Sequence, residues 1–145
     1  MAFSIVNLPQ TMKIRTEDNQ IMELNGKLFN ESVALREAFE MHDDPEVSEI
    51  PVPVESADFK NALNLLSFFD LDKPYHPELD CRFLQADQPP MKFLHALSDD
   101  DKAGMEIAID YLECERLDDC LRVYFCEVIH KYLFDCYRYA EEKKH

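Results

Sequence analysis

Cys126 and His130 are the residues whose types and spacing could most directly do chemistry, because they lie four positions apart in a helical pattern. That spacing places both side chains on one helix face, where they could share a metal ion or act as nucleophile and base. A closed zinc site needs two more ligands, and the spacing of Cys114 and Cys120 is not that of a metal knuckle. A cysteine hydrolase, the remote alternative, would also need an oxyanion donor and a nucleophile motif. We therefore expect Cys126 to be a core residue, and we expect no metal, no cofactor and no catalytic residue.

Two acidic clusters, Asp43-Asp44-Pro45-Glu46 and Asp99-Asp100-Asp101, could suggest calcium binding. Neither has the alternating ligand spacing or the central glycine of a calcium-binding loop. We interpret the first cluster as a solvated loop. The second is typical of a helix start, where the helix dipole favours negative charge.

The composition excludes several classes of function. The chain has 145 residues, which suits one domain, and its 30 acidic and 15 basic residues give a formal charge of −15. A basic stripe is absent from the sequence, so we expect neither nucleic acid nor a membrane surface as a partner. The first ten residues lack the pattern of a secretory signal. Five cysteines, an odd number without a secreted-framework pattern, favour a cytoplasmic or nuclear location, or both.

The elements that must position these residues begin with a hairpin. Residues 12–16 and 21–24 alternate apolar and polar side chains around a polar turn, which predicts two antiparallel strands. Asn30 and Ser32 are both suitable N-caps for a helix that follows. The segment Ile50-Pro51-Val52-Pro53-Val54 predicts a short strand at a sheet edge, since proline cannot donate to the ladder.

Helices dominate the rest of the chain. Ser56 is expected to cap one helix, Met91 to Leu97 to form a short one, and Ser98 to open another. The helix opened by Ser98 is expected to turn inward the residues Met105, Ala108, Ile109 and Leu112. We expect residues 70–90 to form a long connecting loop, residues 1–11 to be flexible and residues 140–145 to form a charged tail. The last helix carries an apolar stripe through Leu121, Phe125, Val128, Ile129, Tyr132 and Cys136. The pattern as a whole predicts an α+β fold, with a small N-terminal sheet and a cluster of helices.

This order of elements resembles the BTB/POZ fold in its Skp-like form, that of the Skp and elongin C adaptors. Four segments carry the resemblance, over about residues 12 to 133 of a domain spanning 12–139. They are Asp18-Asn19-Gln20-Ile21-Met22-Glu23-Leu24, Asn30-Glu31-Ser32-Val33-Ala34-Leu35-Arg36, Ile50-Pro51-Val52-Pro53-Val54, and Ile107-Ala108-Ile109-Asp110-Tyr111-Leu112 followed by Leu117.

The resemblance implies a non-catalytic adaptor that joins a cullin scaffold of a ubiquitin ligase to a receptor protein with an F-box or BC-box. The cullin-binding residues would then be Asp110, Tyr111 and Leu112, although the family usually has asparagine at the first of these positions. The chain also lacks, after Leu133, the threonine-proline-glutamate-glutamate signal that opens the last F-box-binding helices of Skp proteins.

Aromatic residues crowd the last twenty positions on more than one helix face, which favours a binding module. We expect a groove for a partner helix to be lined by Leu121, Phe125, Ile129, Tyr132 and Tyr137. The alternative is a repurposed scaffolding protein of the same fold, which self-associates or binds a helical partner outside the ubiquitin system.

Overall fold

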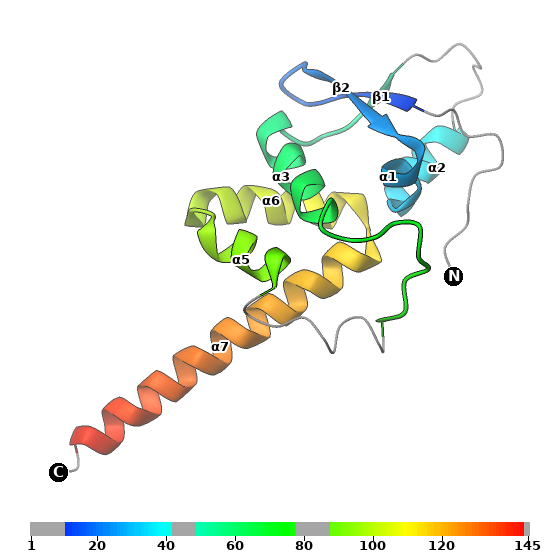
Figure 1. Ribbon diagram of the computed structural model, residues 1–145. Coiled ribbons are helices and arrows are strands. Elements are labelled where there is room, and N and C mark those ends of the chain that lie inside the picture. The colour runs from blue at the N-terminus through cyan, green and yellow to red at the C-terminus, as the bar shows by residue number, and fades with distance from the viewer. Residues whose placement is uncertain (1–10, 42–48, 78–87, 144–145) are drawn as a thin grey trace.

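The computed structural model describes residues 11–41, 49–77 and 88–143. A small sheet lies at one end of a helical body, and the long helix α7 (Glu115–Lys143) extends away from that body (Figure 1). This arrangement confirms the predicted α+β class. The acidic loop predicted around residues 43–46 lies outside the described residues.

The sheet forms as the alternating pattern predicts. Strands β1 (Thr11–Arg15) and β2 (Ile21–Asn25) are antiparallel, with Met12 opposite Leu24, and β3 (Ile50–Pro51) pairs parallel to β1. The order β2-β1-β3 confirms that the proline-containing strand lies at an edge. Met12, Ile14 and Leu24 turn inward and are buried, so the inner face of the sheet rests on the helices.

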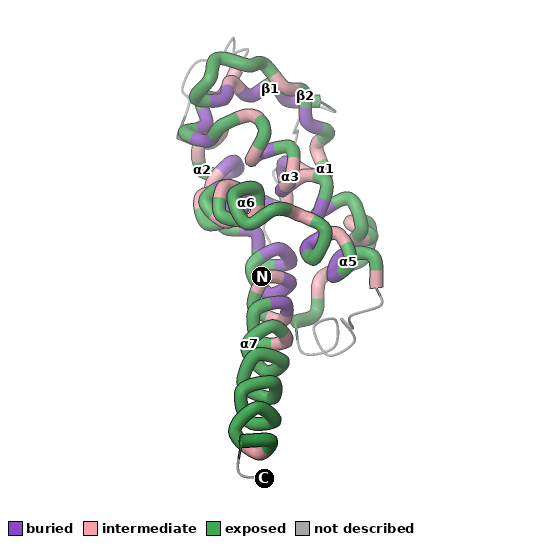
Figure 2. Tube along the Cα trace, turned by 90° about the vertical axis from the view of Figure 1, so that its left-hand side faces the viewer, coloured by how far each residue is buried: buried purple, intermediate pink, exposed green. Residues whose placement is uncertain are grey.

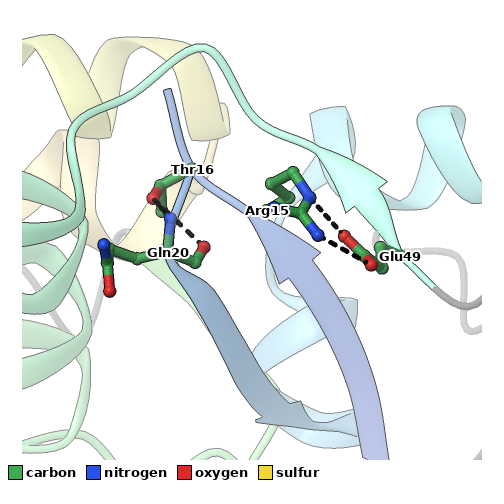
Figure 3. Close-up of polar contacts among 4 residues, drawn as sticks. All are labelled: Arg15, Thr16, Gln20 and Glu49. Atoms are coloured by element: carbon green, nitrogen blue, oxygen red, sulfur yellow. Dashed lines mark hydrogen bonds and ion pairs between the residues drawn. The ribbon is translucent and has the colours of Figure 1, made fainter. Parts of the chain in front are cut away.

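Side-chain contacts hold the hairpin and the edge strand in place (Figure 3). The Gln20 amide donates to the Thr16 hydroxyl oxygen over 3.0 Å and closes the turn. The Arg15 guanidinium donates through Nε and Nη2 to the two Glu49 carboxylate oxygens, over 2.6 and 3.0 Å. This two-pronged ion pair ties the end of β1 to the residue just before β3.

Two helices, and not one, follow the hairpin. Asn25 caps the short helix α1 (Gly26–Asn30) by accepting from the Leu28 amide, and this helix was not predicted. Ser32 caps α2 (Val33–Met41) by accepting from the Leu35 amide over 3.1 Å. Of the two predicted caps, Ser32 is therefore correct, whereas Asn30 ends the helix before it.

Helix α3 (Ser56–Leu66) is capped from elsewhere in the fold. Ser56 was expected to be its N-cap, but Glu55 occupies that position without a side-chain hydrogen bond. Asp18, in the hairpin turn, accepts instead from the Ser56 amide over 2.9 Å and from the Ser56 hydroxyl over 2.6 Å. The turn thus brings a carboxylate to the positive end of the helix.

Helices α5 (Pro89–Ala96) and α6 (Asp99–Leu112) complete the body. Ser98 caps α6 as predicted, by accepting from the Asp101 amide. The body packs tightly where α6 crosses α3: a Cβ atom at Gly104 would lie 2.1 Å from Asp58 Oδ1. The inner face of α6 is the predicted one, and it consists of Met105, Ala108, Ile109 and Leu112.

The predicted segment limits shift slightly in the structure. Of the long loop expected at 70–90, residues 71–76 carry no helix or strand, residues 78–87 lie outside the described part, and α5 already begins at Pro89. Residues 140–143 of the expected charged tail continue α7. At the other end, β1 begins at Thr11, and residues 1–10 are outside the described part.

Candidate interaction surfaces

The end of α6 carries the three residues for which cullin binding was expected. Asp110 is exposed and Tyr111 is half-buried, and burial raises the pKa of the Tyr111 hydroxyl. Leu112 is 3% exposed and lies in the core, so its side chain is not available to a partner that leaves the core intact. Glu113 follows with a left-handed φ of 51° and turns the chain into α7. The accessible part of this surface is therefore Asp110 and the outer edge of Tyr111.

Helix α7 divides into a buried half and an exposed half. Burial on α7 is confined to the part near its start, and most of the rest of the helix is exposed (Figure 2). Tyr124 is the last residue of α7 that is buried in the described part of the chain. The centroids of the Tyr124 and His95 rings lie 4.9 Å apart, and Lys102 Nζ lies 5.4 Å from the centre of the Tyr124 ring. We call residues 125–143 the α7 arm.

In the described residues, the side chains predicted to line a partner-helix groove are mostly exposed, and the groove stays a prediction. Leu121 is half-buried against the body, while Phe125, Ile129, Tyr132 and Tyr137 are 37%, 56%, 66% and 65% exposed. A groove needs a second wall, and in the described part of the chain no side chain of the arm is buried against one. The predicted residues instead form the surface of a helix that projects from the body. Tyr137 also lies about a third of a turn away from the other three exposed residues on this helix.

The thiols take different places from those expected. Cys126 and His130 are exposed on the arm, so the prediction that Cys126 is a core residue is wrong. Its position just beyond Tyr124, where α7 leaves the body, explains the exposure. Among the described cysteines, Cys114 and Cys120 are buried, and burial raises the pKa of the Cys114 thiol to about 12.

In the ranges that the structure describes, no three cysteine, histidine, aspartate or glutamate side chains converge as metal ligands would. Helix α7 is long, but over those same ranges no helix is apolar enough to cross a membrane.

Sequence reasoning missed a polar junction at the start of α7. Arg116, 6% exposed, donates to Glu31 Oε2 over 3.0 Å and to the Lys73 carbonyl, and its guanidinium lies over the Tyr75 ring. The Tyr75 hydroxyl in turn donates to Asp119. The signal in the sequence is the spacing of Arg116, Cys120 and Tyr124 by four positions, which places the arginine on one helix face with two apolar residues. A charged side chain on a buried face needs an ion-pair partner.

The residues for which partner binding was predicted therefore lie at two places on the described surface, namely the end of α6 and the α7 arm. Comparison with known proteins does not extend this result. The sequence matches no protein-family model, and no curated protein is significantly similar to it.

Proposed function

We propose that the chain is a non-catalytic adaptor of the Skp-like BTB/POZ type, which joins a cullin scaffold to a receptor protein. The observation that carries the proposal is the α7 arm. It presents eight large apolar side chains that are all at least 37% exposed. Five of the eight are aromatic, namely Phe125, Tyr132, Phe134, Tyr137 and Tyr139. Aromatic side chains are typical anchors of protein interfaces, because they bury a large area with few rotatable bonds.

The element order supports the proposed fold. A hairpin, two helices, a short parallel edge strand and a helical cluster follow one another, in the order that the four resembling segments imply. The Asp110-Tyr111-Leu112 segment ends a helix at the surface of the body. Its exposed carboxylate and half-buried ring suit a contact with a cullin.

The two surfaces are far enough apart to be occupied together. Tyr111 lies just before the start of α7, whereas the arm begins at Phe125, about 15 Å along α7 from Glu115, and reaches Tyr137 at about 33 Å. In this proposal the scaffold binds at the end of α6 and the receptor binds the arm. Such an adaptor raises the local concentration of a ligase and its substrate without any chemistry of its own.

The test is direct binding of the purified chain to a panel of purified cullin N-terminal domains, measured by calorimetry. We expect binding to at least one cullin, and we expect Asp110→Lys and Tyr111→Ala each to weaken it by about 30-fold, as for an interface hot spot. Tyr139→Ala, which changes an exposed tyrosine on the arm, is the matched control and leaves cullin binding unchanged.

Failure of the wild-type chain to bind any cullin of the panel contradicts the adaptor function. Equal binding by wild type, Asp110→Lys and Tyr111→Ala contradicts the assignment of this surface. Circular dichroism of both variants verifies that they remain folded, and Asp110→Lys is the safer of the two because its side chain is already exposed.

A further inference from the structure

A regular apolar stripe runs along the α7 arm. It consists of residues spaced alternately by four and three positions: Phe125, Ile129, Tyr132, Cys136 and Tyr139. All five are exposed, and we call them the α7 seam. Spacing by four and three keeps successive side chains on one line of the helix and is the repeat by which two helices pair side by side.

The seam is not a continuation of the face by which α7 packs on its own body. Leu117, Cys120 and Tyr124 are the buried apolar residues of that face. At 3.6 residues per turn, the same face continues along the arm through charged positions, and the seam lies about a quarter of a turn away from it. Those charged positions are Lys131, Asp135, Arg138 and Glu142. The body as described therefore does not need the seam for its own core.

The charge of the chain is distributed unevenly about the arm. The segment 125–145 carries four acidic and four basic residues, so the formal charge of −15 resides in residues 1–124. The acidic residues of the segment are Glu127, Asp135, Glu141 and Glu142, and the basic ones are Lys131, Arg138, Lys143 and Lys144. A neutral arm does not select a partner of opposite charge, and it does not repel another neutral arm.

We propose that the α7 seam pairs with the seam of a second copy of this chain, with the two helices antiparallel. A parallel pair would place two bodies of charge −15 side by side. In an antiparallel pair with Phe125 opposite Cys136, the two points at which α7 leaves its body lie about 20 Å apart along the axis, which exceeds the Debye length of about 8 Å at physiological salt. The neutral arm thus allows association while the antiparallel direction limits the repulsion between the bodies.

Antiparallel pairing has a register that fits the side chains. Ile129 packs against Tyr132 of the second copy, and Phe125 packs against Cys136 of the second copy. The same register sets Asp135 beside Val128 of the second copy and avoids a contact between equal charges. Four seam residues on each arm meet in this register and amount to roughly 400 Å² per copy, which is about half the size of a standard specific interface. The dimer is therefore expected to be in concentration-dependent exchange with monomer.

The first test is sedimentation of the full chain between about 1 and 200 µM, a range that brackets a micromolar dissociation constant. We expect the weight-average mass to rise from monomer towards dimer. Ile129→Asp should abolish the rise, because it buries an unpaired charge at the centre of the seam. The matched control is Phe134→Asp: Phe134 is 60% exposed, close to the 56% of Ile129, but it lies on the opposite side of the helix and should leave the rise intact.

A wild-type chain that stays monomeric over the whole range overturns the proposal. Equal loss of association in Ile129→Asp and Phe134→Asp also overturns it, since association would then not use the seam. The test needs only the purified chain, so it is independent of the adaptor function: cullin binding can fail while the dimer stands, and the reverse.

The second test determines direction by mild oxidation and peptide mapping. In the double variant Phe125→Cys with Cys126→Ser, the antiparallel register brings the introduced thiol to Cys136 of the second copy, so this mixed disulfide should be the main product. A parallel pair would instead bring the two Cys136 side chains together, in wild type as well. A Cys136–Cys136 disulfide as the main product overturns the antiparallel proposal.

Discussion

At the scale of single residues, Asp18 joins parts of the fold that are distant in sequence. Its carboxylate accepts hydrogen bonds from the Ser56 hydroxyl, the Ser56 amide and the Thr16 hydroxyl. These bonds, led by the one from the Ser56 hydroxyl, lower the pKa of Asp18 from its ordinary 3.8 to about 2. Each bond favours the charged form of the carboxylate, so the fold is stabilised when Asp18 is ionised.

The first prediction concerns pH. Because the pKa of Asp18 is lower in the folded state, its contribution is fully present above about pH 4 and is lost as the pH falls towards 2. Asp18→Asn should therefore unfold at lower denaturant concentration than wild type at pH 7. The gap between the two proteins should narrow between pH 4 and pH 2, as measured by urea unfolding at several pH values.

Glu23→Gln is the control for this series, since it removes an exposed carboxylate from the neighbouring strand β2. Its stability relative to wild type should change little over the same pH range. A gap between wild type and Asp18→Asn that stays constant down to pH 2 would show that the carboxylate charge is not what stabilises the start of α3.

At the scale of elements, the start of α7 is held by Arg116. One guanidinium group contacts Glu31 from the α1–α2 junction, the Lys73 carbonyl and the Tyr75 ring from the segment after α3. Both Arg116 and Asp119 are buried, so their charges are compensated inside the fold. Loss of one member of such a network leaves a partner that is removed from water and unsatisfied.

The second prediction is that Arg116→Met lowers the free energy of unfolding by about 2–3 kcal/mol. The same change at Arg122, six residues later on the helix, is a matched control. The Arg122 side chain is 73% exposed although it lies 3.0 Å from Asp119. Arg122 stays solvated although its partner Asp119 is buried, and a pair with a solvated member contributes about 0–1 kcal/mol, so Arg122→Met should lower the free energy of unfolding by less than about 1 kcal/mol. Chemical denaturation measures the free energy of unfolding of both variants. Equal decreases for Arg116→Met and Arg122→Met would argue against a stabilising role of the buried Arg116 contacts.

Local signals predicted helix starts only where the capping group is local. Ser32 and Ser98 cap the helices that follow them, since each accepts from an amide three residues ahead. The predicted cap of helix α3, Ser56, was wrong because the carboxylate that accepts from the start of this helix comes from Asp18, 38 residues earlier. The short helix α1 escaped prediction because its five residues are too few to show an apolar period.

At the scale of the whole molecule, a body that buries its own core carries an arm that buries none of its side chains. Most of the stability of a protein helix comes from packing of an apolar face, and the arm has no buried side chain in the described residues. The arm is thus the part of the described structure whose order depends most on a partner, whether a receptor or a second copy.

The third prediction follows from this division. Removing residues 127–145 should change the free energy of unfolding of the body by less than about 1 kcal/mol in dilute solution, because no buried side chain is lost. Leu117→Ala, at a fully buried position of the same helix, should lower the free energy of unfolding by about 2–5 kcal/mol. Thermal or urea unfolding measures both, and a large loss on truncation would mean that the arm packs on the body in solution.

The sequence by itself determined what depends on neighbours along the chain. The alternation in the hairpin, the edge proline, the serine caps and the inner face of α6 all follow from periods and propensities that act within a few residues. They sufficed for the α+β class and for the positions of most helices. The apolar period of the last helix was also visible, but a period states only which residues share a face.

Only the tertiary structure decided which helix faces pack against another element and which remain exposed. It buried Leu112 and exposed Asp110 beside it, and it moved Cys126 from the expected core to the arm. Burial depends on whether a second element lies opposite a residue, and that is set by contacts between segments distant in sequence. The same apolar residues on α7 can therefore be a core, a groove or a free seam, and the end of the body at Tyr124 makes them a seam.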